Sequence, residues 1–200
     1  MTETTSAPLP PGATAPEETM WQGDWIVARR RANWEYVGRA RNIRAAVILP
    51  IDDSAADGPH VLLVEQYRVP LGRACIELPA GLVGDTTDNA DEDATAAAAR
   101  ELTEETGYAA DRLENLGQFW SSPGMVTESF TLLRAHGLRK VAEGGGIGDE
   151  NITVHRVPMS GIGAFIAERR ARGDAIDVKL LMLLGPAIFG AGLAGVLAGA

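Results

Sequence analysis

Three glutamates near the middle of the chain, Glu101, Glu104 and Glu105, have the spacing of a metal site. On a helix, Glu101 and Glu105 lie one turn apart on the same face, and Glu104 lies beside them. Carboxylates grouped in this way repel one another unless they share a cation, and Mg2+ prefers oxygen ligands. We therefore expect a divalent-cation site here, although an isolated Glu-Glu pair would indicate only a solvated acidic face.

The residues around these glutamates are consistent with such a site. Arg100 stands four positions before Glu104 and can pair with it, which would fix one carboxylate while the others face the metal. Glu92 stands about two helical turns before Arg100 and could brace the same arginine. Leu102 is expected to point away, toward the core.

The elements that must position this cluster follow from local patterns. Residues 94–106 are rich in alanine and predict a helix that ends at Gly107. The segment 75–84 is expected to be a strand followed by a loop. β-Branched and aromatic residues predict further strands, and an amphipathic pattern predicts later helices. The expected strands are 25–31, 34–40, 43–51, 60–69, 113–120, 128–138 and 152–158; the expected helices are 161–173 and one that begins near residue 176.

The length of 200 residues predicts one domain, which we place at residues 21–190, with N-terminal strands at about 21–45. Residues 1–20 are rich in Pro, Thr and Ala and are expected to form a disordered tail. Residues 191–200 form an apolar tail of small residues. No charged residue occurs in 180–200, but glycines and a proline interrupt this stretch, so a membrane helix is the less favoured interpretation.

Composition narrows the function. A chain with 46% hydrophobic and 22% charged residues is typical of a folded enzyme. The net charge of -9 argues against binding to nucleic acid or to an anionic membrane, so a phosphate substrate would need metal ions or a few arginines. The single cysteine, Cys75, cannot form an internal disulfide and favours the cytoplasm. His60, His136 and His155 lack metal-ligand spacing.

Residues 92–108 resemble the Nudix box, G-x5-E-x7-R-E-U-x-E-E-x-G-U, where U is a bulky apolar residue. Every specified position from Glu92 to Tyr108 matches, with Tyr108 as the last U. Thr86 stands where the box glycine belongs, so Gly81, or less favourably Gly84, must serve. Gly81 implies an insertion of about five residues, which a surface loop tolerates, and places the whole motif at 81–108.

The resemblance implies an α/β fold, the Nudix α/β/α sandwich around a mixed β-sheet. It implies Mg2+ as the cofactor, for which Mn2+ can substitute, with Glu101, Glu104, Glu105 and the Ala80 carbonyl as ligands. Among these, Glu101 and Glu105 are also expected to be catalytic, together with Arg100. The reaction is attack of water on a phosphorus atom.

Flanking motifs resemble the ADP-ribose pyrophosphatase branch of the family, whose members show a proline about sixteen residues beyond the box. Pro123 is sixteen residues after Gly107, and the segments EQYRVP, IELPAG and SSPGMVTE also match. The implied substrate is a nucleotide-sugar, ADP-ribose, which would be hydrolysed to AMP and ribose 5-phosphate. The branch also implies a homodimer in which the N-terminal strands take part.

The resemblance assigns further residues to the substrate. Arg68 matches an arginine that contacts the substrate phosphates, and Glu77 matches a glutamate near the site. Glu128 matches a position in a substrate-binding loop. Arg39 is a further candidate for binding the substrate. Trp34 matches an aromatic ring stacked on adenine, with Trp25 as its rival.

Glu150 matches a mobile glutamate that assists the attack of water, with Asp149 as its rival, and the four glycines between 144 and 148 would let that loop close. Cys75 and Trp120 are expected in the core.

Three alternatives stay open. The enzyme could act on another nucleotide-sugar or on a dinucleotide such as NADH, and less favourably on oxidised nucleoside triphosphates. A non-catalytic nucleotide-sensing module is a rival from another class, but the intact glutamates argue against it. The third is a membrane-tethered form that uses the apolar tail.

Overall fold

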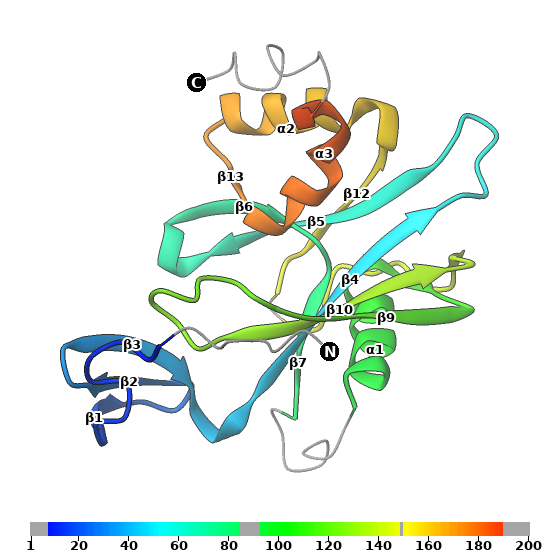
Figure 1. The fold of residues 1–200 in the computed structure, drawn as a ribbon. Helices are drawn as coiled ribbons and strands as arrows, with labels where there is room; N and C mark the ends of the chain where they lie inside the picture. The colour runs from blue at the N-terminus through cyan, green and yellow to red at the C-terminus, as the bar shows by residue number, and fades with distance from the viewer. Residues whose placement is uncertain (1–7, 85–92, 149, 190–200) are drawn as a thin grey trace, which may run out of the picture. The chain divides into compact units, whose positions relative to one another are not determined.

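The computed structural model describes residues 8–84, 93–148 and 150–189. The chain divides into two compact units. The first comprises Met1–Arg44 with Trp120–Ser129, and the second comprises Ala45–Phe119 with Phe130–Ala200. Figure 1 shows the strands and helices of both units.

The first unit is built on a three-stranded antiparallel sheet of β1 (Glu17–Gln22), β2 (Ile26–Arg31) and β3 (Trp34–Arg39), followed by the 3-10 turn η1 (Ala40–Asn42). Cross-strand ion pairs join Glu17 to Arg29 at 3.3 Å and Glu18 to Arg30 at 2.7 Å. The strand β1 therefore begins inside the segment 1–20 that was expected to be a tail, because charges on β2 pair with its glutamates.

The second unit contains the main sheet. Among the described residues its order is β13-β6-β5-β4-β10-β9, while β12 pairs with β5 and β7 with β4. The strands are β4 (Arg44–Asp52), β5 (His60–Arg68), β6 (Arg73–Glu77), β7 (Ala80–Val83), β9 (Arg112–Trp120), β10 (Ser129–His136), β12 (Thr153–Pro158) and β13 (Ala175–Ile176). A separate pair joins β8 (Tyr108–Ala109) to β11 (Arg139–Lys140). Parallel pairing of β10 with β4 beside antiparallel β5 and β6 makes the sheet mixed, as predicted.

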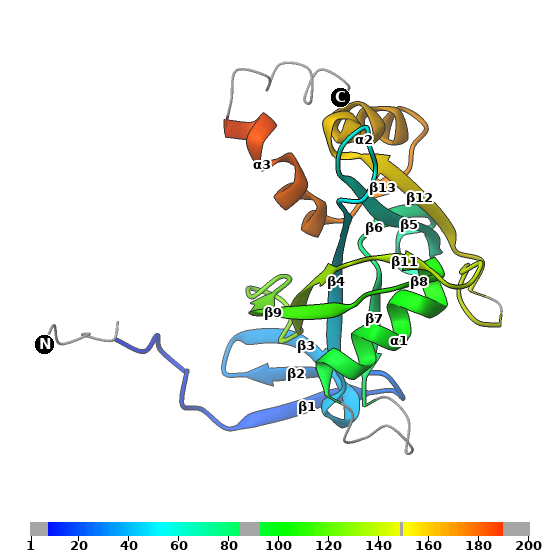
Figure 2. The same ribbon diagram turned by 90° about the vertical axis from the view of Figure 1, so that its right-hand side faces the viewer.

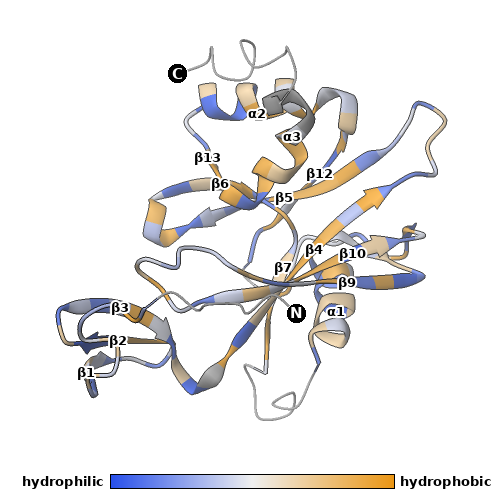
Figure 3. Cartoon of the chain, in the orientation of Figure 1, coloured by the Kyte–Doolittle hydropathy of each residue, from blue (hydrophilic) through white to orange (hydrophobic). Residues whose placement is uncertain are grey.

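Helices cover both faces of this sheet. The helix α1 (Ala94–Thr106) packs Ala97, Ala98 and Leu102 on one face. The helices α2 (Ile162–Ala171) and α3 (Leu181–Phe189) pack on the other face, and Figure 2 shows α1 separated from them by the strands. Alternate residues of β4 supply the two cores, Val47 to one and Ile48 to the other. Hydrophobic colour accordingly runs along β4, β5 and β7 in Figure 3.

Short 3-10 turns join several elements: η2 (Val69–Leu71), η3 (Met159–Gly161) and η4 (Val178–Leu180). The last helix begins at Leu181 rather than near residue 176, because β13 pairs with β6 and Asp177 then caps η4 through the Lys179 amide at 2.7 Å. Within the described ranges, no helix is long and apolar enough to cross a membrane.

Candidate active site

The helix α1 has the bounds that the sequence predicts, and both its ends are fixed locally. Asp93 accepts hydrogen bonds from the amides of Thr95 at 2.6 Å and Ala96 at 2.9 Å, which caps the N-terminus. Gly107 closes the other end with a φ of 75°, a conformation that glycine adopts without strain. The glutamates near the carboxyl end of α1 are therefore held on a regular helix.

Two of the three glutamates are held by one arginine. The Arg100 Nη1 atom donates to Glu101 Oε1 at 2.8 Å and to Glu104 Oε2 at 3.1 Å. Glu105 is 5% exposed, and its Oε2 accepts from the Ala80 amide at 3.0 Å. The carboxyl end of α1 thus meets the start of β7. Within the described residues, no three Asp, Glu, His or Cys side chains are grouped to hold a metal ion in this arrangement.

Burial makes two carboxylates of this group, Glu101 and Glu105, costly to ionise. Loss of water raises the pKa of Glu105 to about 8, and the charges of Glu101 and Glu150 raise it further against the Ala80 hydrogen bond. Burial also raises the pKa of Glu101 to about 7, with repulsion from Glu104 and Glu150, while Arg100 opposes the shift. The cluster of Glu101, Glu104, Glu105 and Glu150 is a concentrated negative centre that a cation would stabilise.

The strand β7 passes directly against this cluster. A β-carbon built on Gly81 would overlap the side chain of Glu101, so a larger residue at this position would displace that carboxylate. This contact supports the choice of Gly81 as the box glycine. The bracing residue Glu92 and the insertion within 85–92 lie outside the described residues.

An arginine is fixed beside the cluster by a buried partner. Arg68 donates from Nε to Glu77 Oε1 at 2.5 Å and from Nη2 to Glu77 Oε2 at 2.8 Å, a bidentate pair between β5 and β6. Glu77 is 6% exposed, whereas the Arg68 side chain is 41% exposed. The charge of Arg68 also lowers the pKa of Glu105, so this guanidinium lies within electrostatic reach of the helix.

Glu150 follows the glycine-rich segment that leads to β12. Its Oε2 accepts from the Ile147 amide at 2.8 Å, and its charge acts on both Glu101 and Glu105. Its rival Asp149 lies outside the described residues. The second unit therefore brings together eight of the predicted residues: Arg68, Glu77, Ala80, Arg100, Glu101, Glu104, Glu105 and Glu150.

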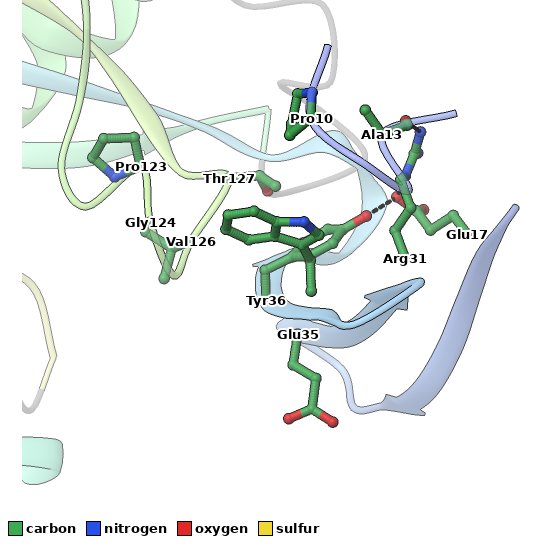
Figure 4. Close-up of a pocket in the computed structure, with 11 residues that line it drawn as sticks. Pro10, Ala13, Glu17, Arg31, Glu35, Tyr36, Pro123, Gly124, Val126 and Thr127 are labelled. Atoms are coloured by element: carbon green, nitrogen blue, oxygen red, sulfur yellow. Dashed lines mark hydrogen bonds and ion pairs between the residues drawn. The ribbon is translucent and has the colours of Figure 1, made fainter. Parts of the chain in front are cut away.

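The other three predicted residues, Trp34, Arg39 and Glu128, lie in the first unit. Trp34 is 51% exposed and lines a cavity of about 470 Å³. In Figure 4, Tyr36 lies between the loop that carries Pro123 and the N-terminal segment with Pro10. The Tyr36 hydroxyl donates to Glu17 Oε2 at 2.5 Å. Trp25, the alternative to Trp34, does not line this cavity and has the Arg41 guanidinium over its ring at 5.3 Å.

Arg39 and Glu128 are partners of each other. Arg39 donates from Nε to Glu128 Oε1 at 2.8 Å, and its Nη2 lies 2.6 Å from the same oxygen. The backbone of Val37 bonds the same loop, donating to the Met125 carbonyl at 3.0 Å and accepting from the Thr127 amide at 2.9 Å. The strand β3 therefore holds the loop that forms one side of the cavity.

The sequence reasoning missed part of this cavity and misplaced one aromatic residue. Tyr36 and Arg31 line the cavity but are not among the residues that the sequence predicts for the site, although Tyr36 stands two positions from Trp34 and so belongs to the same face of β3. Trp120 was expected in the core and is 56% exposed, so that expectation was wrong: β9 is exposed along its second half. Cys75 and Leu102 are buried as expected.

Several named proteins are similar in sequence to part of this chain. The chain is 34% identical over 131 residues to an uncharacterized Nudix hydrolase of Schizosaccharomyces pombe, covering 61% of the chain and 57% of the relative. It is 36% identical over 111 residues to the methanol dehydrogenase activator of Bacillus methanolicus, covering 55% and 57%. It is also 36% identical over 132 residues to a GDP-mannose pyrophosphatase of Yersinia pestis, covering 62% of each. The matches thus span less than two thirds of these relatives.

A solved structure described as an ADP compounds hydrolase has the same fold. Its TM-score is 0.60 at 23% identity, and the superposition covers 88% of this chain and 94% of that one. The predicted α/β architecture around a mixed sheet is therefore confirmed. The model of the NUDIX domain matches residues 41–158, which include the cluster of glutamates on α1, Arg68 and Glu150. The chain belongs to the NUDIX family.

Proposed function

We propose that this protein is a pyrophosphatase that hydrolyses compounds in which a nucleoside diphosphate is linked to another group, with ADP-ribose as the first candidate. The observation that carries the proposal is the buried group of carboxylates on α1 beside Arg68. A cation would stabilise the ionised form of such a centre, and cations together with an arginine can bind a diphosphate in a protein of net charge -9.

The chemistry of the donor atoms in this cluster suits a magnesium ion, although the described side chains are not yet grouped around one point. The donor atoms are carboxylate oxygens, and burial raises the pKa of Glu101 and Glu105, so a bound cation would favour their ionised form. Glu101, Glu104 and Glu105 would hold Mg2+ or Mn2+, together with the carbonyl of Ala80. An ion bound there would polarise a phosphoryl oxygen and neutralise the charge that develops on it.

The residues of the chain itself would then have separate roles in the reaction. Arg68, oriented by Glu77, binds the phosphates, because a fixed guanidinium fork matches the geometry of phosphate oxygens. Arg100 orients the Glu101 and Glu104 carboxylates. Glu150 accepts a proton from the attacking water, whose oxygen bonds to phosphorus as the bond from phosphorus to the bridging oxygen breaks. With ADP-ribose the products are AMP and ribose 5-phosphate.

The cavity beside Trp34 is our candidate for binding the nucleoside base. It offers an exposed indole and the ring of Tyr36, and aromatic faces bind flat heterocycles by stacking. Arg39 and Glu128 hold one wall of the cavity through their ion pair. We further propose, as the resemblance implies, that the protein is a homodimer that acts in the cytoplasm.

A second candidate substrate is GDP-mannose. It is favoured by the relative from Yersinia pestis that is named a GDP-mannose pyrophosphatase. Both candidates present a diphosphate between a nucleoside and a sugar, so the same centre on α1 would serve them.

The test is incubation of the purified protein with ADP-ribose, GDP-mannose, NADH and an oxidised nucleoside triphosphate, with Mg2+ or with EDTA, and chromatography of the products. We expect magnesium-dependent release of AMP and ribose 5-phosphate from ADP-ribose. Glu105→Gln, which keeps the size of the side chain, is the matched inactive control. Turnover of none of these compounds would overturn the proposal, and binding of ADP-ribose without turnover would indicate a sensing module.

A further inference from the structure

The segment of residues 140–146 lies against the carboxyl end of α1. The Gly145 amide donates to the Glu105 carbonyl at 2.8 Å, and the Gly146 amide donates to the Glu104 carbonyl at 3.0 Å. These carbonyls belong to the last turn of the helix, where no partner within the helix exists. The segment therefore caps the helix whose side chains form the carboxylate cluster.

The contact is close enough to require a glycine. Gly144 has a φ of +78°, and a β-carbon built there would overlap the backbone of Thr106 and Gly107. Backbone atoms cannot rotate out of the way as the end of a side chain can. Any larger residue at position 144 would lift the segment from the helix.

The charge of a lysine adds to this docking. Lys140 Nζ donates to the Thr106 carbonyl at 3.2 Å and to the Glu143 carbonyl at 2.9 Å. A cation near the carboxyl end of a helix is also favoured by the helix dipole. The docked segment is thus held by both hydrogen bonds and charge.

The docked glycines also contact Glu150. A β-carbon on Gly146 would overlap the Glu150 side chain, and the neighbouring Ile147 amide donates to the Glu150 carboxylate. The Ile152 amide donates to the Gly145 carbonyl at 3.1 Å, which holds the chain just beyond Glu150. Glu150 is therefore linked to the end of α1 through Gly145 and Gly146.

We propose that Gly144, Gly145 and Gly146 are positioning residues: they dock on the end of α1 and so fix Glu150 at the carboxylate cluster. This inference rests on the proposed function for its catalytic consequence. The sequence alone led us to expect that these glycines let the loop move and close. In the proposal, the docked segment needs glycine because it approaches the helix closely, and not because it moves. Gly148 differs from the other three, since it has a φ of +62° but nothing within 4 Å of its added β-carbon.

The first test compares Gly144→Ala with Gly148→Ala. Both put alanine at a positive φ, but only the first meets the helix backbone. We expect Gly144→Ala to lower kcat about tenfold or more, since small misplacements of a catalytic group are costly, with KM changed less than about twofold because substrate binding does not use Glu150. The kcat of Gly148→Ala should stay near that of the wild type. Equal losses in both variants would indicate loop movement and would overturn the proposal.

A double-mutant cycle asks whether Gly144 acts through Glu150. If it does, the variant with both Gly144→Ala and Glu150→Gln should be no slower than Glu150→Gln alone, because the misplaced carboxylate is already lost. If the loss of kcat in the double variant equals the product of the losses in the two single variants, Gly144→Ala causes general structural damage, and the proposal is overturned. If Gly144→Ala does not fold, Lys140→Met replaces it in the same cycle, with a smaller loss expected.

Hydrogen exchange tests the docking without any substrate. In the wild type, the amides of Gly145 and Gly146 should be protected, and in Gly144→Ala they should exchange faster while a peptide from 94–104 is unchanged. Rapid exchange of both amides in the wild type would overturn the docking. A wild-type protein that turns over no substrate but protects these amides would refute the proposed function and leave the docking intact.

Discussion

Among single residues, the decisive feature is the carboxylate of Glu105, which is buried away from water. Glu105 has a pKa of about 8 in the folded protein, against an ordinary value of 4.5. At a pH between these two pKa values, the carboxyl group of Glu105 is ionised in the unfolded chain but keeps its proton in the folded protein. The folded state therefore loses stability as pH rises through this range, by up to about 1.4 kcal/mol per pH unit for each proton retained.

This argument predicts the behaviour of Glu105→Gln. In EDTA, the variant should unfold at a higher temperature than the wild type at pH 7–8, and its stability should fall less steeply between pH 5 and 8. Mg2+ should raise the unfolding temperature of the wild type and have little effect on the variant, because a ligand is missing. Circular dichroism melts with and without Mg2+ measure both effects. A variant that Mg2+ stabilises as much as the wild type would place the metal elsewhere.

The sequence predicts which residues carry the chemistry better than it predicts which side chains they form ion pairs with. Glu101, Glu104 and Glu105 follow from helical spacing, and the Arg100 to Glu104 pair from an interval of four. The pairs Arg68 to Glu77 and Arg39 to Glu128 could not be predicted in this way, since they depend on strand register and on contacts 89 positions apart. Residues assigned separately to the substrate are therefore also partners of each other.

At the scale of elements, the ends of α1 decide where the glutamates lie. The bounds Ala94–Thr106 were predicted correctly because alanine propensity and Gly107 are local signals. The start of β1 at Glu17 and the late start of α3 were not, since β1 depends on cross-strand pairing with β2 and the segment before α3 depends on pairing of β13 with the distant β6. Local patterns thus predict the helix that carries the chemistry better than they predict the edges of the sheets.

A substitution at the cap tests this element. Asp93→Ala removes the acceptor for the Thr95 and Ala96 amides. We expect a loss of about 1 kcal/mol in the free energy of unfolding, as is usual for a lost N-cap. Asp93→Asn, which retains an acceptor oxygen, should recover most of it. Urea denaturation of the three proteins measures the difference, and equal stability of all three would show that the helix does not depend on its cap.

For the molecule as a whole, the exposed large apolar residues of the first unit, most of them aromatic, need an explanation. Met20, Trp21, Trp25 and Trp34 are each more than half exposed on or beside the three-stranded sheet. Apolar groups of this size on a surface are typical of an interaction site. The resemblance implies that the N-terminal strands take part in a homodimer, which would cover part of this surface.

We therefore expect the 200-residue chain to sediment at about twice its 21.1 kDa mass. Trp21→Glu should shift it toward the monomer, because a charge buried in an interface without a partner is costly. Val178→Glu is the matched control: Val178 is 57% exposed, as Trp21 is, but lies in the second unit. Analytical ultracentrifugation over a range of concentrations separates the outcomes. If Trp21→Glu sediments as the wild type does, the three-stranded sheet is not the dimer interface. Its exposed aromatic residues would then be candidates for binding the substrate.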